Sequence, residues 1–384
     1  MRFERILNKP LESSRSFFLF GPRGTGKTSW LKHHLPNVLF INLLQADFFA
    51  SLSAHPQRLR SLIPSGYNDW VVIDEVQRAP ALLNEVHDLI ETTNLQFILT
   101  GSSARKLRRE GVNLLAGRAR TYHMHPLTVE EQGAAFDLHA SIMHGHLPAR
   151  FSDPEPDVYL RNYVHTYLRE EVMQESLTRN IGNFSRFLEV ASFSQGQTIN
   201  INGVAREASV SRSVAENYFS ILEDLLISVR LPVFSHRAKR GLVTLSKFYY
   251  FDAGVFRTIR PTGPLDSSAE IDGPALETLI LQELRAINDC YNYGYQIYFW
   301  RTHGGLEVDF VLYGQRGLLA FEIKRSAHIG PKDTRALREF KKDYPPAQCI
   351  LLYGGTMPQY HNEITVLPIG HALENMANLL KGQQ

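Results

Sequence analysis

Cysteine is scarce in this sequence, with Cys290 and Cys349 the two examples among 384 residues. Two cysteines cannot build a disulfide framework, and these two lack the close spacing of a metal-binding motif. An excess of one charge is also lacking, because 41 Lys and Arg residues oppose 39 Asp and Glu residues for a formal charge of +2. These shortages argue against a disulfide-stapled secreted fold and a uniformly basic nucleic-acid coat, but leave room for local basic patches.

Long apolar runs are missing as well. No uninterrupted stretch approaches the roughly 18 apolar residues that a membrane-spanning helix needs. The first residues, Met1 to Arg5, lead into no apolar segment of the kind that a secretory signal requires. Together with the low cysteine content, this predicts a soluble, cytoplasmic protein with no membrane partner.

Length and apolar content predict several ordinary globular domains. At about 150 residues per domain, 384 residues correspond to two or three. A hydrophobic fraction of 43% with 21% charged residues supports buried cores. Composition and pattern divide the chain into domains at residues 1–138, 157–260 and 270–384, with residues 139–156 as a linker.

The first third of the chain alternates short apolar runs with longer mixed segments. The runs predicted as buried strands are residues 16–20, 38–43, 70–73, 96–100 and 121–124. The segments between them are long enough for helices. This alternation predicts an α/β fold with a parallel sheet covered on both faces.

A phosphate-binding loop directly follows the first of these strands. Its residues are Gly21, Pro22, Arg23, Gly24, Thr25, Gly26, Lys27 and Thr28. The glycines let backbone N–H groups wrap a phosphate, and the N-terminus of the following helix adds positive charge. Lys27 is predicted to reach the β- and γ-phosphates of ATP, and Thr28 to ligate Mg²⁺.

Two neighbouring strand ends carry the other polar groups of this region. The third predicted strand runs into Asp74 and Glu75. Asp74 is predicted to hold the water shell of Mg²⁺, and Glu75 to polarise the water that attacks the γ-phosphorus. After the fourth strand, one of Thr100, Ser102 or Ser103 is expected to orient that water or contact the γ-phosphate, because ligands bind at the carboxyl edge of an open α/β sheet.

The middle segment has the rhythm of helix, short helix, turn, helix and hairpin. The helices are expected at residues 184–193, 204–208 and 212–226, and the strands at 227–234 and 242–251. This layout predicts a winged helix-turn-helix whose basic tip, residues 236–240, suits phosphate contacts. The third helix also carries several acidic residues, so a packing or relay role is the alternative to DNA binding.

A β-hairpin with facing charges is predicted in the last segment. Two alternating runs flank Gly314–Gly317, which suits a tip at Gln315-Arg316. In that register Asp309 faces Glu322 on one side of the hairpin, and Glu307 faces Lys324 on the same side.

Two facing carboxylates repel each other unless a cation lies between them, so Asp309 and Glu322 are predicted Mg²⁺ ligands. Lys324 is expected to stabilise developing phosphate charge or an attacking hydroxide. The alternative is a solvent-facing hairpin with ordinary cross-strand ion pairs.

These motifs together resemble the AAA-type ATPases of prokaryotes, in the group whose uncharacterised C-terminal domain is similar to restriction endonucleases. The resemblance rests on the two nucleotide motifs, Leu99-Thr100-Gly101-Ser102-Ser103, Leu115-Ala116-Gly117-Arg118, Glu307-Val308-Asp309 and Glu322-Ile323-Lys324. It implies that the strand before the phosphate loop lies beside the Leu-Thr-Gly-Ser strand and that Ser102 is a sensor. It also implies that an arginine acts on the γ-phosphate and that Glu277 is a helix-borne metal ligand. Arg118 matches the arginine best, while Arg105, Arg108 and Arg109 lie nearer the sensor strand.

The sequence therefore predicts an ATPase, with ATP and Mg²⁺ as cofactors, built from an AAA-type parallel-sheet domain, a winged-helix-like domain and a restriction-endonuclease-like α/β domain. The first hypothesis is that nucleotide state is coupled to binding or cleavage of DNA or RNA, in a homo-oligomer. The rival hypothesis is a nucleotide-controlled switch whose C-terminal domain binds without catalysis.

Overall fold

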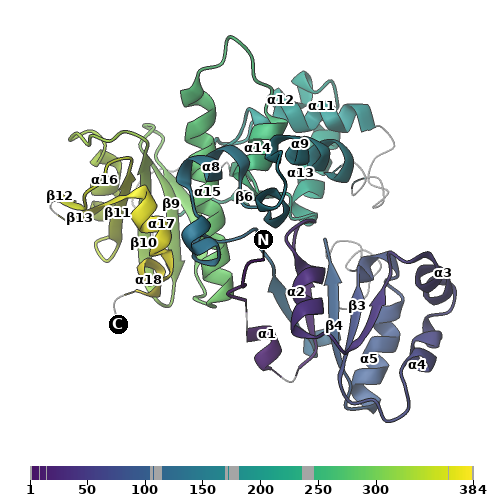
Figure 1. Ribbon diagram of the computed structural model, residues 1–384. Helices are drawn as coiled ribbons and strands as arrows, with labels where there is room; N and C mark the ends of the chain where they lie inside the picture. The colour runs from purple at the N-terminus through teal and green to yellow at the C-terminus, as the bar shows by residue number, and fades with distance from the viewer. Residues whose placement is uncertain are drawn as a thin grey trace. The chain divides into compact units, whose positions relative to one another are not determined.

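A computed structural model shows the fold as two compact units (Figure 1). The described residues are 2–7, 9–13, 15–103, 107, 115–168, 172, 181–235, 246–361 and 363–382. One unit comprises Arg2–Pro126 with Ile221–Ile227, and the other comprises Leu127–Ser220 with Ser228–Gln384. The predicted middle and C-terminal segments therefore share a unit; their division into separate domains stays a prediction.

The N-terminal unit contains a five-stranded parallel sheet. Its strands are β1 (Phe17–Phe20), β2 (Leu39–Asn42), β3 (Trp70–Asp74), β4 (Gln96–Gly101) and β5 (Arg120–His123). Their order is β2-β3-β4-β1-β5, and every neighbouring pair is parallel. The parallel α/β fold is thereby confirmed, and β1 lies beside β4 as the resemblance implied.

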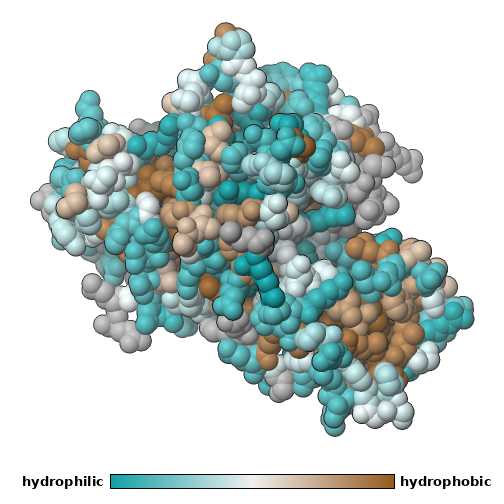
Figure 2. Space-filling view, in the orientation of Figure 1, coloured by the Kyte–Doolittle hydropathy of each residue, from teal (hydrophilic) through white to brown (hydrophobic). Residues whose placement is uncertain are grey.

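Helices complete this unit; the first precedes β1, and the others lie between strands along the chain. They are α1 (Lys9–Glu12), α2 (Lys27–His34), α3 (Ala46–Ala54), α4 (Leu59–Leu62) and α5 (Leu82–Thr92). Helix α5 buries Leu82, Val86 and Leu89, the spacing of a helix with one apolar face. In Figure 2, apolar side chains gather over the region that Figure 1 labels β3 and α5.

The second unit begins with short helices, and here the linker prediction is wrong. They are α7 (Val129–Gln132), α8 (Leu138–His144), α9 (Pro156–Asn162) and a π-helical turn (Tyr163–Leu168). Asp137 caps α8 by accepting a hydrogen bond from the Ala140 N–H at 2.6 Å. Helix α8 packs closely on α14 (Ala253–Ile259), where a Cβ on Gly254 would lie 2.2 Å from the carbonyl oxygen of His144. The polar composition of residues 139–156 thus reflects caps and turns between packed helices.

The middle segment forms three helices and a two-stranded antiparallel sheet in the predicted order. They are α11 (Ile181–Ser192), α12 (Ile201–Glu207), α13 (Arg212–Asp224), β6 (Ser228–Leu231) and β7 (Lys247–Tyr250). The basic tip at residues 236–240 lies outside the described residues. The winged-helix interpretation stays a prediction.

The C-terminal segment places a long helix beside a six-stranded mixed sheet. Its elements are α15 (Ser268–Cys290), β8 (Gln296–Arg301), β9 (Glu307–Gly314), β10 (Gly317–Lys324), α16 (Arg335–Asp343), β11 (Gln348–Tyr353), β12 (Gln359–His361), β13 (Ile364–Pro368), α17 (Ile369–Glu374) and α18 (Met376–Lys381). The strand order is β12-β13-β11-β10-β9-β8. The predicted hairpin register is confirmed from the Gly314–Gly317 pair to the Phe310–Phe321 pair, where this ladder ends; the Asp309–Glu322 and Glu307–Lys324 pairs stay predictions.

The middle segment is joined to this sheet through its backbone. The Phe234 N–H donates to the carbonyl oxygen of Phe299 at 2.7 Å, and the Phe299 N–H donates to that of Pro232 at 3.1 Å. Phe299 belongs to β8, so the chain after β6 pairs with the edge of the C-terminal sheet. Among the helices that the structure describes, none is long and apolar enough to span a membrane.

Candidate functional sites: a phosphate loop and a carboxylate pocket

The predicted phosphate loop joins β1 to α2 in a tight backbone turn. Gly24 and Gly26 adopt left-handed conformations, with φ of 84° and 92°. A Cβ on Gly21 would lie 2.3 Å from the carbonyl oxygen of Met124. Glycine is therefore required at these positions by backbone conformation or by close approach.

The side chains of the loop brace it from within. Lys27 is 5% exposed, and its ammonium donates to the carbonyl oxygens of Gly21 at 2.7 Å and Pro22 at 3.2 Å. The Thr25 hydroxyl donates to the Pro22 carbonyl at 2.9 Å. The Lys27 ammonium is thus held over the loop, where it can exchange carbonyl partners for phosphate oxygens.

Arg5 also holds the loop, and no motif in the sequence pointed to it. Its guanidinium donates to the carbonyl oxygens of Thr25 at 2.7 Å and His125 at 2.6 Å. These bonds tie the phosphate loop to the chain that follows β5. Arg5 precedes the first strand, and its partners are distant in sequence, so spacing alone offered no signal.

Thr28 and Asp74 meet at the carboxyl edge of the sheet. The Thr28 hydroxyl donates to Asp74 Oδ2 at 3.0 Å, and the Thr100 hydroxyl donates to Asp74 Oδ1. Asp74 is 1% exposed. Hydroxyl and carboxylate oxygens are hard ligands that suit Mg²⁺, so this pair fits the ion that nucleotide hydrolysis requires.

Glu75 and Ser102 are bridged by a residue that sequence reasoning missed. The Gln77 amide donates to Glu75 Oε2 at 2.5 Å and to the Ser102 hydroxyl at 3.1 Å. Glu75 itself has φ of 61°, a left-handed conformation uncommon outside glycine. A Cβ on Gly101 would lie 2.5 Å from Gln77 Oε1, so glycine there makes room for the bridge.

Replacing Gln77 with Ala is expected to lower kcat of ATP hydrolysis about tenfold and leave KM nearly unchanged, because the Glu75 carboxylate loses its positioning hydrogen bond. Gln77→Glu should be equally slow, since a carboxylate cannot donate. Gln96→Ala, at the opposite end of β4, is the matched control. Steady-state phosphate release measures all three. An increase in KM alone would contradict the positioning role.

Arg118 lies apart from this network. It precedes β5, whose first residue Arg120 pairs with Phe17 at the start of β1. Its guanidinium forms an ion pair with Glu91 near the C-terminal end of α5. Arg118 is therefore near the amino edge of the parallel sheet, whereas the phosphate loop follows the carboxyl end of β1. The other candidates, Arg105, Arg108 and Arg109, lie outside the described residues.

A second group of charged side chains lies on the C-terminal hairpin. Asp309 lies one residue before Phe310, and Ile323 lies two residues after its partner Phe321. The Ile323 N–H donates to Asp309 Oδ2 at 2.8 Å. The Lys324 ammonium donates to Glu322 Oε1 at 2.6 Å. Asp309 and Glu322 are 8% and 5% exposed, and Glu322 Oε2 has no hydrogen-bond partner among the described residues.

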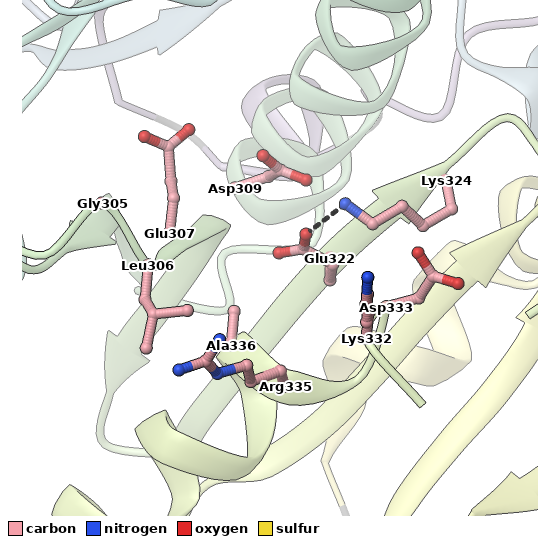
Figure 3. A pocket seen from close by; sticks show the side chains of 10 residues that line it. All are labelled: Gly305, Leu306, Glu307, Asp309, Glu322, Lys324, Lys332, Asp333, Arg335 and Ala336. Carbon is pink, nitrogen blue, oxygen red and sulfur yellow. Dashed lines mark hydrogen bonds and ion pairs between the residues drawn. The ribbon is translucent and has the colours of Figure 1, made fainter. Parts of the chain in front are cut away.

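These groups line a pocket of about 430 Å³. Figure 3 shows the Asp309 and Glu322 carboxylates with the Lys324 ammonium reaching back to Glu322, and Lys332 pointing toward that pair from the loop before α16. Arg335, at the start of α16, lines the pocket as well. Carboxylates and cations thus share one cavity, a combination that suits a metal ion and a phosphate group.

Lys247 enters the same group of carboxylates from β7, and the sequence did not point to it. Its side chain is 1% exposed, and its ammonium pairs with Glu307 and lies 3.7 Å from Asp309 Oδ1. Burial alone would lower the pKa of Lys247, but the carboxylates of Glu277, Asp309 and Glu307 outweigh it and raise that pKa. The lysine is therefore a buried, charged ion-pair partner.

Glu277, the implied helix-borne ligand, lies at the side of this group. It accepts a hydrogen bond from the Tyr249 hydroxyl at 2.9 Å. Burial and the neighbouring Asp309 raise the pKa of Glu277 to about 7. Burial and Asp309 also raise the pKa of Glu322 well above its usual value. Among the described residues, no three His, Cys, Asp or Glu side chains converge into a metal-binding group, so the predicted three-carboxylate set is not assembled as a coordination sphere.

The comparisons with known proteins agree with the N-terminal geometry. Residues 13–132 match the family described as an AAA domain. This part of the chain is therefore similar to an AAA domain. Residues 136–266 and 272–372 match two domains of unknown function, DUF8612 and DUF4143. The second match covers the carboxylate pocket without assigning it an activity.

Whole-chain relatives carry no stated activity. The chain is 26% identical over 361 residues to the uncharacterized proteins Rv2008c of Mycobacterium tuberculosis and Mb2031c of Mycobacterium bovis, covering 91% of this chain and 78% of each relative.

Similarity to solved structures is weak. An ORC1 protein of Aeropyrum pernix in complex with DNA has a TM-score of 0.25 and 12% identity, covering 64% of this chain and 86% of that one. Protein VC1899 of Vibrio cholerae has a TM-score of 0.23 and 12% identity, covering 96% and 98%. Can2 of Sulfobacillus thermosulfidooxidans, bound to cyclic tetra-adenylate, has a TM-score of 0.24 and 10% identity, covering 96% and 100%. Scores this low carry no argument about fold or ligand.

Proposed function

We propose that this protein hydrolyses ATP with Mg²⁺ and couples its nucleotide state to nucleic-acid binding by the C-terminal pocket. The observation that carries the first part is the set of contacts at the carboxyl edge of the N-terminal sheet. There Thr28 bonds Asp74, and Gln77 bridges Glu75 to Ser102. The AAA match of residues 13–132 supports the same activity.

Each residue of that edge has a distinct task. Lys27 binds the β- and γ-phosphates, and the loop N–H groups surround them. Thr28 and Asp74 would hold Mg²⁺, which neutralises phosphate charge when bound. Glu75 accepts a proton from the attacking water, and Ser102 helps to orient that water through Gln77.

Arg118 is proposed to act on the γ-phosphate of a neighbouring subunit. Its place near the amino edge of its own sheet disfavours action on its own nucleotide. Arg118→Ala is therefore expected to lower kcat at least tenfold. Mixing Arg118→Ala with Glu75→Gln chains should restore part of the activity, because mixed assemblies contain one intact site. Unchanged turnover in Arg118→Ala alone would rule this arginine out.

For the C-terminal pocket, the proposed ligand is a nucleic-acid phosphate. The supporting observation is a pocket lined by Lys324, Lys332 and Arg335, in which Glu322 Oε2 has no hydrogen-bond partner within the described part of the chain. Asp309 and Glu322 would hold a divalent ion, with Glu277 beside them. Lys324 would stabilise charge on the phosphate.

If the pocket cleaves phosphodiesters, Asp309→Asn should weaken Mn²⁺ binding and cleavage together, because a ligand is lost. Lys324→Ala should keep the ion but lower cleavage about 100-fold or more, because transition-state stabilisation is lost. ATP hydrolysis at the N-terminal site should stay within twofold in both variants. Gel assays on DNA and RNA, with Lys342→Ala as the control on α16, measure cleavage. Equal cleavage by Lys324→Ala and wild type would contradict the role.

A binding-only pocket is the second candidate. Lys247 already pairs with Glu307 beside Asp309, and no three-ligand metal group converges among the described residues. This candidate predicts oligonucleotide binding without cleavage under any divalent ion, and binding that Lys332→Ala weakens more than Asp309→Asn.

A further inference from the structure

Lys247 is a cation that the protein itself supplies to two carboxylates of the pocket lining. Glu307, Asp309 and Glu322 are among the acidic side chains that line the pocket. At the Glu307 end, Oε1 pairs with Lys247 and Oε2 lies 3.3 Å from an Arg301 nitrogen. At the other end, the Lys324 ammonium pairs with Glu322 Oε1. Glu322 Oε2 has no hydrogen-bond partner among the residues that the structure describes.

Contacts other than ion pairs also position the Lys247 ammonium. Its strand β7 is fixed beside the pocket, because the neighbouring Tyr249 hydroxyl donates to Glu277 and the Tyr249 ring packs on Phe310 at 5.8 Å between centroids. The ammonium also lies 5.6 Å from the centre of the Phe299 ring, within cation–π range. With the side chain 1% exposed, water cannot replace the carboxylates as partners.

We propose that Lys247 is a resident cation beside the pocket, taking a position next to Glu307 and Asp309 that a second divalent ion would otherwise fill. The wild-type pocket then admits a single divalent ion, at the Glu322 end where an oxygen is unsatisfied. This inference rests on the proposed metal site for the identity of that single ion.

Charge explains why one ion is the limit. At the Glu307 end, two cations already oppose the carboxylates, so a divalent ion there would meet like charge and no unpaired oxygen. At the Glu322 end, one ammonium opposes Glu322, while Asp309 receives one backbone N–H and a more distant ammonium. A neutral residue at position 247 removes one of these two cations and leaves Glu307 Oε1 and Asp309 Oδ1 to bind an ion.

The test counts Mn²⁺ ions per chain by calorimetry and electron paramagnetic resonance, with full-length protein and no nucleotide. Lys247→Met is expected to bind one ion more than wild type, and the extra ion should disappear in Lys247→Met/Glu307→Gln. Mn²⁺ should also restore much of the Tm that Lys247→Met loses. Lys341→Met, which removes a part-buried ammonium hydrogen bond to the Ala347 carbonyl, is the control and should change neither the ion count nor the Tm in Mn²⁺.

Equal ion counts in wild type and Lys247→Met would overturn the inference. A wild-type chain with no Glu322-dependent ion, beside a variant with one new Glu307-dependent ion, would support the resident cation while rejecting the proposed metal site. If Lys247→Met does not fold, the Glu307→Gln variant tests the proposal in its place. Because Glu307 is already neutralised, that change should alter wild-type Mn²⁺ affinity less than twofold, and a tenfold loss would contradict the proposal.

Discussion

Glu75→Gln is expected to slow ATP hydrolysis about 100-fold or more while keeping ATP affinity within about threefold of wild type. The carboxylate is lost as a proton acceptor, but the amide keeps the shape of the side chain. The phosphate loop, Lys27 and Thr28 are untouched, so nucleotide binding persists. Phosphate release and binding of a fluorescent ATP analogue measure the two quantities separately.

Glu85→Gln is the matched control for this change. Glu85 is in the same unit on α5 and pairs with Arg60 on the surface. Surface pairs of this kind contribute little to stability, so hydrolysis should be unchanged. Turnover by Glu75→Gln equal to that of wild type would show that another group activates the water.

Lys247→Met is expected to lower the free energy of unfolding of the second unit by about 3–5 kcal/mol without added metal, because removing one partner leaves buried carboxylates uncompensated. Trp300, fully buried in the C-terminal sheet, reports unfolding of this unit. Urea titration in a Trp30→Phe/Trp70→Phe background isolates its fluorescence.

Lys341→Met serves as the control in the same background, because it removes one hydrogen bond to a carbonyl rather than a counter-charge. Its expected loss is about 1 kcal/mol. A loss below about 1 kcal/mol in Lys247→Met would mean that the carboxylates are not held by this lysine.

The local sequence pattern was sufficient to predict much of the fold. The five parallel strands appear as short apolar runs because both of their faces are buried, and the observed strand bounds differ from those predicted by at most one residue at either end. The hairpin register followed from a two-residue tip, which determines every pair after it. The phosphate loop was recognisable because glycine, lysine and threonine meet separate physical requirements within eight residues.

The contacts that sequence reasoning missed are tertiary. Arg5, Gln77 and Lys247 each contact partners that the chain brings together only after folding, and none stands in a motif. Gln77 had a weak signal, since it lies two residues after Glu75 in a turn at the ligand-binding edge. Lys247 had none, because its strand looks like any apolar strand that begins with a lysine.

The linker prediction failed for a related reason. Residues 139–156 are rich in histidine, proline and aspartate, which usually indicate an exposed connection. In the structure, Asp137 caps α8, and His146 is fully buried with its N–H bonded to Asp252 at 2.7 Å. Polar residues in and next to this segment therefore form hydrogen bonds inside a packed unit.

The central claim is that nucleotide state controls nucleic-acid binding, and one measurement tests it most directly. Fluorescence anisotropy of labelled single-stranded DNA, duplex DNA and RNA is followed with Glu75→Gln protein in Mg²⁺-ATP and in Mg²⁺-ADP. The account predicts that Kd for at least one of these ligands differs tenfold or more between the two nucleotides. It also predicts that the difference disappears in Lys27→Ala, which loses nucleotide binding. Equal Kd values in both nucleotides, or no binding of any of the three ligands, would contradict it.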